Sequence, residues 1–239
     1  MLSIHSEAII HEDSCIENFT VIGKGVKIEK DVYISKGVCI YGKALIREGT
    51  YIGENSIIGH PQRFQLQNVI KSKRPSTDFE GPEVTIGENC IIRAGSIIYS
   101  EVIMGNHCQT GHNVLIREKT KIGGNTLIGT NCIIEGNVSI GDNVSIQSGV
   151  YIPLFSRVGN DVFLGPNCVL TNDKYMTRKK FKLIGPTIED KVSLGANSVI
   201  LPGLTLKLGT IVGAGAVVTK DTDEFDVVVG NPAKRISKN

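Results

Sequence analysis

The sequence is poor in large aromatic side chains and has no long apolar run. Tryptophan is absent and only 5% of the 239 residues are aromatic, so aliphatic and small side chains have to fill the core. No apolar stretch approaches the length of a membrane span, and the first residues lack the basic region and apolar segment of a secretory signal. These absences predict a cytoplasmic protein without a membrane partner.

Neither the charge nor the cysteine spacing indicates a particular partner. Lys and Arg number 26 against 24 Asp and Glu, and the net charge of +2 is too small to favour nucleic acid. The six cysteines include no C-x-x-C pair, which argues against a disulfide framework and a zinc site. We expect reduced thiols, no nucleic-acid partner and no metal.

What the chain does have is a six-residue repeat. Isoleucine returns at every sixth position from Ile4 to Ile58, a second series runs from Ile86 to Leu170, and a third runs from Ile188 to Val218. Six is a multiple of the strand period of two but not of 3.6, so the repeat predicts short strands joined by turns rather than helices.

The rest of each unit fits tight corners between strands. Many units read aliphatic-Gly-x-Asn-small, and Gly and Asn tolerate the positive φ that a sharp corner needs. Asn113 occupies the corner position, which favours a structural role. The small position also explains four cysteines by packing rather than by chemistry: Cys90, Cys108, Cys132 and Cys168.

This repeat resembles that of the hexapeptide-repeat acyltransferases. The resemblance implies an all-β fold, a left-handed parallel β-helix that forms a three-sided prism with three hexapeptides per turn. It also implies homotrimers with sites between neighbouring prisms. We expect the β-helix over residues 1–218, with excursion loops at about 59–83 and 171–187, and a short C-terminal tail over 219–239.

Both loops are rich in cations, which are either solvated or suited to the pyrophosphate of coenzyme A or of a nucleotide sugar. These cations are Lys71, Lys73, Arg74, Arg178, Lys179, Lys180 and Lys182. The tail Gly230-Asn231-Pro232-Ala233-Lys234-Arg235 resembles the ending that lies near the nucleotide of coenzyme A in hexapeptide acetyltransferases. The alternative is a turn that merely closes the prism.

One repeat unit breaks the pattern with polar residues. Thr110 stands where an aliphatic residue belongs, and His112 follows it. A neutral imidazole can accept a proton from an attacking amine or hydroxyl, so His112 is the candidate general base, with an uninvolved surface histidine as the alternative. Glu118 is the second catalytic candidate, on a neighbouring face of the coil.

The segments 146–152, 163–173 and 188–202 resemble N-acetyltransferases that act on nucleotide-linked amino sugars, although these often carry Asn where Gly149 stands. The resemblance implies direct attack of the sugar amine on the thioester of acetyl-CoA, without a metal. We expect the donor at Asn172, Gly195, Ala196, Gly213, Ala214, Lys234 and Arg235. We expect the acceptor at His60, Gln62, Arg63, Gln147 and Tyr151.

Three alternatives stay open. Residues 59–62 resemble the O-acyltransferase that begins lipid A synthesis, but Glu118 stands where that family has its catalytic histidine. The γ-type carbonic anhydrases share the fold, and His107 and His112 have suggestive spacing, but a third zinc ligand at that family's spacing is missing. A non-catalytic scaffold would need neither the loops nor the tail.

Overall fold

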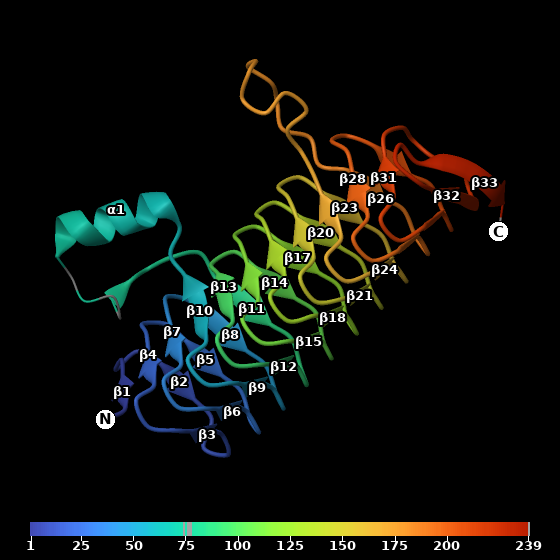
Figure 1. Cartoon of the computed structure of the whole chain (residues 1–239). Coiled ribbons are helices and arrows are strands. Elements are labelled where there is room, and N and C mark those ends of the chain that lie inside the picture. The colour runs from blue at the N-terminus through green and yellow to red at the C-terminus, as the bar shows by residue number, and fades with distance from the viewer. Residues whose placement is uncertain (74, 76–77, 239) are drawn as a thin grey trace. The chain divides into compact units, whose positions relative to one another are not determined.

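The computed structural model describes residues 1–73, 75 and 78–238. Its contacts divide the chain into two compact units, unit 1 over Met1–Lys119 and unit 2 over Thr120–Asn239. Within each unit, short strands stack into three parallel sheets, the pattern of a three-sided β-helix (Figure 1). This confirms the expected β-helix. None of the described helices is long and apolar enough to cross a bilayer.

Unit 1 contains sheets I, II and III, which the chain visits in turn. Sheet I has β1 (Ser3–Ile4), β4 (Val21–Ile22), β7 (Cys39–Ile40), β10 (Ile57–His60), β13 (Ile97–Tyr99) and β16 (Leu115–Ile116). Sheet II has β2 (Ile9–Ile10), β5 (Lys27–Ile28), β8 (Ala44–Ile46), β11 (Val84–Ile86) and β14 (Ile103–Met104). Sheet III has β3 (Cys15–Ile16), β6 (Tyr33–Ile34), β9 (Tyr51–Ile52), β12 (Ile91–Ile92) and β15 (Gln109–Thr110).

Unit 2 contains sheets IV, V and VI. Sheet IV has β19 (Ile133–Ile134), β22 (Tyr151–Ile152), β25 (Val169–Leu170), β28 (Val199–Ile200) and β31 (Val217–Val218). Sheet V has β17 (Lys121–Ile122), β20 (Ser139–Ile140), β23 (Arg157–Val158), β26 (Thr187–Ile188) and β29 (Thr205–Leu206). Sheet VI has β18 (Leu127–Ile128), β21 (Ser145–Ile146), β24 (Phe163–Leu164), β27 (Ser193–Leu194), β30 (Ile211–Val212), β32 (Asp226–Val229) and, antiparallel to β32, β33 (Lys234–Lys238).

The core is the aliphatic series that the sequence predicts. From Ile22 to Ile58, every member is at most 3% exposed. The inward Thr110 is also fully buried, and its hydroxyl oxygen accepts the N–H of Arg93 at 3.0 Å. The break at Thr110 is therefore structural, because this hydroxyl satisfies a backbone donor next to the core.

The corners and the buried cysteines also have the predicted structural roles. Asn113 has φ 55°, and the same left-handed conformation occurs at Asn55 and Asn167. The four cysteines at the small position are buried. A hydrogen bond with Cys108, together with burial, raises the pKa of Cys90, and burial raises the pKa of Cys132 and Cys168. These thiols are therefore unreactive packing groups.

The first excursion contains a helix that the sequence pattern did not predict. α1 (Arg63–Ser72) begins after β10 and lies outside the stacked strands of unit 1 (Figure 1). Gln62 N–H donates to Oε1 of Gln65 at 2.6 Å at its start, and Lys73 ends it with φ 53°. Of the loop cations, Arg74 lies outside the described residues.

The second excursion, in unit 2, projects from the coils as an irregular segment (orange in Figure 1). The Asp173 carboxylate accepts the backbone N–H groups of Tyr175, Met176 and Thr177 at 2.9–3.0 Å. Phe181 packs edge-on against the Tyr175 ring, with 5.1 Å between the centroids. This segment therefore has a local hydrogen-bonded turn although it lies outside the repeat.

Candidate functional site

A cluster of polar and aromatic side chains lies where the strands of sheet I end in unit 1. It contains His60 from the end of β10, Tyr99 from the end of β13, and Arg117 and Glu118 just after β16. We call these four residues, together with Gln62 and Glu101, the sheet I cluster. Its members come from three successive coils, so the fold rather than a local motif brings them together.

A bulge at Gly59 turns His60 to the outside of the coil. Ile58 pairs with Ile98, and both are fully buried. Two residues later His60 would point inward too, but the pairing shifts at Gly59 and His60 lies opposite the outward Tyr99 instead. Gly59 has φ 76°, and a Cβ there would lie 2.4 Å from the Tyr41 carbonyl oxygen, so only glycine fits this bulge.

An aromatic and a cationic side chain both contact the Tyr99 ring. The His60 imidazole lies 4.7 Å from it between centroids, and the Arg117 guanidinium carbon lies 5.6 Å from its centroid. Arg117 also donates to both oxygens of Glu118, from Nε at 3.1 Å and from Nη2 at 2.9 Å. This bidentate pair fixes the guanidinium, which in turn covers the ring.

A second set of polar contacts extends the cluster toward α1. The Gln62 side-chain amide donates to Oε1 of Glu101 at 2.8 Å, and Lys119 Nζ lies 4.0 Å from the other oxygen of Glu101. Glu101 adopts φ 64°, an uncommon conformation for this residue type. Arg63, the third acceptor residue predicted in this region, is exposed at the first position of α1.

The two predicted catalytic residues lie at opposite ends of one strand. His112 is exposed in the corner before β16, whereas Glu118 is half-buried in the corner after it. Glu118 belongs to the sheet I cluster, and His112 does not. The two side chains therefore lie in different corners of the same coil.

The predicted donor residues of unit 2 lie in two regions. Asn172 is at the base of the second excursion, where its side-chain amide donates to the Leu154 carbonyl at 3.2 Å. Gly195 and Gly213 lie in stacked corners, and a Cβ on Gly195 would be 2.4 Å from the backbone nitrogen of Ala214. Close coil stacking therefore accounts for this glycine, and Ala196 lies half-buried beside it.

The tail of unit 2 surrounds a hollow of about 280 Å³ with cations. Lys220, Lys234 and Arg235 line it together with Asp226. Arg235 Nη1 lies 3.5 Å from Oδ1 of the buried Asp226, an oxygen without a hydrogen-bond partner among the described residues. Asp221 also lines the hollow, so three cations stand beside two carboxylates and leave a small positive excess, which suits an anionic group.

The remaining predicted acceptor residues lie in unit 2 on two different sheets. Gln147 follows β21 and donates its side-chain amide to the Ser145 hydroxyl at 2.9 Å, whereas Tyr151 begins β22 and is half-buried. Among the residues described, no group of three or more His, Cys, Asp or Glu side chains is placed to hold a metal ion.

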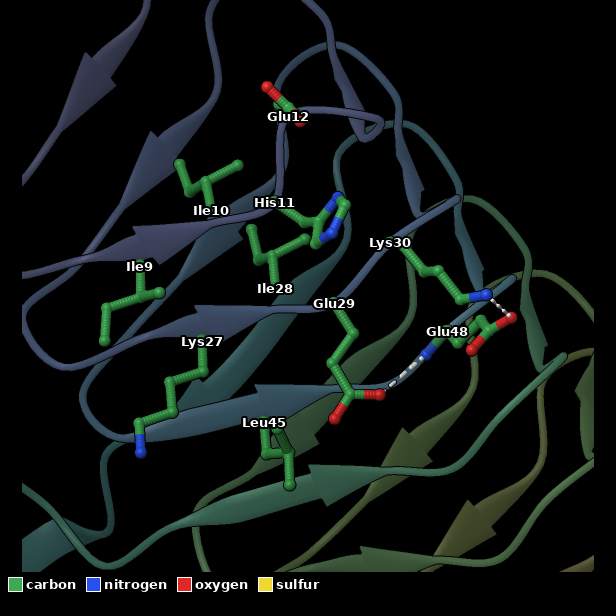
Figure 2. A pocket seen from close by; sticks show the side chains of 10 residues that line it. All are labelled: Ile9, Ile10, His11, Glu12, Lys27, Ile28, Glu29, Lys30, Leu45 and Glu48. Carbon is green, nitrogen blue, oxygen red and sulfur yellow. Dashed lines mark hydrogen bonds and ion pairs between the residues drawn. The ribbon is translucent and has the colours of Figure 1, made fainter.

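A larger hollow of about 690 Å³ lies on the outer face of sheet II and contains none of the predicted site residues (Figure 2). Lys30 Nζ lies 2.9 Å from Glu48, and Glu29 accepts the backbone N–H of Glu48 at 3.1 Å. The Lys27 side chain points away from these carboxylates in Figure 2. Lys30, Glu29 and Glu48 therefore already have partners within the chain, and we place the candidate site at the sheet I cluster rather than in this hollow.

Sequence reasoning found His60, Gln62 and Glu118 but missed Tyr99, Glu101 and Arg117. Residues one coil apart are separated by 18 positions in uninterrupted repeats, as the contact of Glu88 with Asn106 illustrates. Tyr99 and Arg117 have this separation, so the repeat contained the signal for their contact. Gln62 and Glu101 are 39 positions apart, because the first excursion lies between them.

Comparison with known proteins identifies the repeat. Residues 83–118 and 119–153 match the family described as bacterial transferase hexapeptide (six repeats). Residues 187–220 match the hexapeptide repeat of succinyl-transferase.

The curated relatives are matched over part of their length. A putative acetyltransferase of Schizosaccharomyces pombe is 40% identical over 87 residues, 34% of this chain and 42% of that protein. An acyl-[acyl-carrier-protein]–UDP-N-acetylglucosamine O-acyltransferase of Chlamydia pneumoniae is 34% identical over 111 residues, 46% of this chain and 40% of that protein. A 2,3,4,5-tetrahydropyridine-2,6-dicarboxylate N-acetyltransferase of Staphylococcus aureus is 53% identical over 51 residues, 21% of each chain. The chain thus spans less than half the length of these relatives.

Solved structures show lower overall agreement. A hexapeptide-repeat-containing acetyltransferase of Vibrio cholerae, complexed with acetyl coenzyme A, has a TM-score of 0.42 and 26% identity over 49% of this chain and 69% of that one. PerB of Caulobacter crescentus, in complex with CoA and GDP-perosamine, has a TM-score of 0.38 and 19% identity over 78% of this chain and 71% of that one. Three segments of the chain, which together make up less than half of its length, thus match repeats of the hexapeptide-repeat transferases.

Proposed function

We propose that the chain is an acyl-coenzyme A-dependent N-acyltransferase that acetylates the amine of a nucleotide-linked amino sugar. The observation that carries this proposal is the match of three segments to transferase repeats. Two of the sequence relatives are named as acetyltransferases, and one of these is an N-acetyltransferase. Because one fold hosts several reactions, the substrates depend on the side chains of the site.

The tail of unit 2 supports coenzyme A as the donor. Lys220, Lys234 and Arg235 surround the hollow at β32 and β33, and phosphate groups are suitable partners for them. Ala214 is exposed in the preceding coil. We assign the nucleotide end of coenzyme A to these cations and the pantetheine arm to the corner at Gly213 and Ala214. Lys234→Ala should raise the KM for acetyl-CoA, with Lys238→Ala on the same strand as the control.

The sheet I cluster supports an acceptor that carries hydrogen-bonding groups. The His60 imidazole and the Tyr99 hydroxyl come from neighbouring coils, and the Arg117–Glu118 ion pair lies beside them, with the Gln62 amide held by Glu101. A sugar presents hydroxyl and amino groups to such partners, and a nucleotide presents phosphate to arginine. Gln147 and Tyr151 remain proposed acceptor contacts in unit 2.

The reaction does not require a covalent intermediate with the protein. A neutral amine is a good nucleophile toward a thioester, so holding the two reactants together supplies much of the acceleration. Backbone N–H groups facing the thioester oxygen would stabilise the charge that develops on it. His112 stays a proposed catalytic residue, whereas Glu118 would be a positioning residue that holds the Arg117 guanidinium.

We also propose that the chain is a homotrimer in the cytoplasm. The outward row of sheet IV is apolar: Ile133, Tyr151, Val169, Val199 and Val217. The outward row of sheet V is polar: Lys121, Ser139, Arg157, Thr187 and Thr205. A continuous apolar row on one face fits contact with another copy of the chain. The free cysteines fit a reducing compartment.

A second candidate is O-acyl transfer from an acyl carrier protein. The Chlamydia pneumoniae relative has that activity in its name, and its match is the longest of the three above. The two candidates differ in donor and in acceptor atom, so one screen separates them. Acetyl-CoA with amino sugars should release free thiol, whereas acylated acyl carrier protein with UDP-N-acetylglucosamine should release none. The opposite result would establish the second candidate.

A further inference from the structure

The second excursion of unit 2 carries a dense positive charge. No acidic residue lies between Asp173 and Glu189, whereas five exposed cations lie within nine residues of this stretch. Among the residues that the structure describes, none of the five forms an ion pair. Their charge is therefore not neutralised within the chain. The five cations are Lys174, Arg178, Lys179, Lys180 and Lys182.

Contacts within the excursion give it a defined shape. At its base, the N–H of Ile184 donates to the Asn172 carbonyl at 3.1 Å, so the two ends lie close together. Inside it, the Tyr175 ring contacts the Phe181 ring, and Lys179 Nζ lies 5.2 Å from the centroid of Tyr175. The excursion therefore presents its cations on a packed segment that projects from the coils of unit 2 (Figure 1).

Large apolar side chains are exposed among these cations. Met176 is 73% exposed, and Phe181 and Ile184 are also exposed. Met176 adopts φ 49°, an uncommon conformation for a residue of its type, at the turn of the segment. Exposed apolar side chains interleaved with lysines are typical of segments that bind anionic bilayers, because the apolar groups enter the headgroup region while the cations attract the lipid charge.

A lipid surface fits this segment better than other anionic partners do. A small phosphate ligand needs a concave site, but the described hollows of unit 2 are lined by residues outside the segment. Four of the five cations are lysines, which protein interfaces disfavour relative to arginine. Stacking of nucleic-acid bases needs free aromatic faces, whereas the Tyr175 ring already contacts Lys179 and Phe181.

We propose that the second excursion, residues 173–184, docks unit 2 onto the surface of a bilayer that contains anionic lipids. The lysines would lie among the headgroups, and Met176 would enter the boundary between headgroups and acyl chains. Such contact needs no spanning segment, so it differs from the expectation of no membrane partner that followed from the missing apolar run. It goes beyond the proposed acyl transfer and does not depend on it.

The test is co-sedimentation of the purified full chain with vesicles of phosphatidylcholine alone or mixed with phosphatidylglycerol. We expect binding to the mixed vesicles only, weakened by added salt. The triple variant Lys174→Gln, Lys180→Gln and Lys182→Gln should bind about 100-fold more weakly, since each cation at the surface contributes about fivefold. Met176→Asn suits the positive φ and should weaken binding about 3- to 10-fold.

A matched triple variant, Lys121→Gln, Lys191→Gln and Lys238→Gln, removes the same charge from exposed positions of unit 2 outside the excursion. It should bind like wild type, and an equal loss in both triple variants would overturn the proposal. Equal binding to vesicles without phosphatidylglycerol would also overturn it. Absence of binding to either vesicle would leave an acidic protein as the partner and overturn it too. A changed mass of the excursion variant in light scattering would place these lysines at a subunit contact instead.

Discussion

The His60 imidazole packs against the Tyr99 ring with 4.7 Å between their centroids and an angle of 42° between their planes. The pair joins two coils of unit 1 at the point where the first excursion leaves the repeat. Tyr99 therefore connects the backbone bulge that turns His60 outward to the Arg117–Glu118 ion pair on the next coil. The chemistry that we assign to unit 1 depends on this contact.

Replacing Tyr99 should weaken acceptor binding through the position of His60. Tyr99→Leu removes a ring contact that is worth about 0.5–1.5 kcal/mol, so we expect the acceptor KM to rise by at most about 10-fold. Tyr99→Phe keeps the ring and should stay close to wild type. Both variants are measured by steady-state kinetics with the acceptor concentration varied. Equal losses in the two variants would mean that the hydroxyl, rather than the ring, is what matters.

Thr110 provides a test of the structural explanation for the polar break in the repeat. Thr110→Val keeps the shape but leaves the partly buried N–H of Arg93 without its 3.0 Å acceptor, which should lower the free energy of unfolding by about 0.5–1.5 kcal/mol. Thr110→Ser retains the hydroxyl and serves as the matched control for that hydrogen bond. Urea denaturation measures both. A valine variant as stable as wild type would show that the hydrogen bond contributes nothing net.

The residues of unit 1 also show how much of the structure can be predicted from the sequence. The isoleucine period predicts the core because an inward position recurs every six residues, and the corner asparagines follow from their tolerance of positive φ. The Tyr99–Arg117 contact follows from the 18-residue coil. The outward position of His60 does not follow from the repeat. It depends on a bulge in β10 and on an excursion whose length determines the register in which β13 pairs with β10.

The helix in that excursion could not be predicted from the sequence, for a different reason. α1 exposes Phe64, Leu66 and Ile70 and buries Gln65, which is the reverse of an amphipathic core helix. Its first turn is defined instead by the hydrogen bond from Gln62 N–H to Gln65, and Gln62 is at the same time held by Glu101 of the next coil. Local composition could not reveal such a tertiary constraint.

Tyr33 gives a prediction about pH. A hydrogen bond from its hydroxyl to the Glu17 carboxylate raises the pKa of Tyr33 to about 12. The folded state then holds this proton more tightly than the unfolded state, whose tyrosines titrate near 10. The stabilisation is fully present below about pH 10 and is lost as the pH rises toward 12. Glu17→Ala should remove it.

The measurement is a titration of tyrosinate absorbance in wild type, Glu17→Ala and Tyr33→Phe. The wild type should contain one late-titrating tyrosine that is missing from the Tyr33→Phe variant and shifted to lower pH in the Glu17→Ala variant. Identical curves for wild type and Glu17→Ala would contradict the role of this hydrogen bond.

The apolar row of sheet IV predicts the assembly. Val169→Lys places a charge in the middle of that row and should convert trimers to monomers in light-scattering measurements. Thr187→Lys, on the polar row of sheet V, is the matched control and should remain trimeric. A wild type with the mass of one chain would contradict the proposed trimer, and a trimeric Val169→Lys would show that sheet IV is not its interface.

The central claim is acyl transfer from coenzyme A to an amine, and the release of free thiol tests it most directly. Purified protein is incubated with acetyl-CoA and a panel of nucleotide-linked amino sugars, with the corresponding sugars lacking the amine as controls. The account predicts that at least one amino sugar accelerates thiol release and becomes acetylated on nitrogen, as mass spectrometry would detect. Thiol release that no amino sugar accelerates, or that the amine-free sugars accelerate equally, would contradict it.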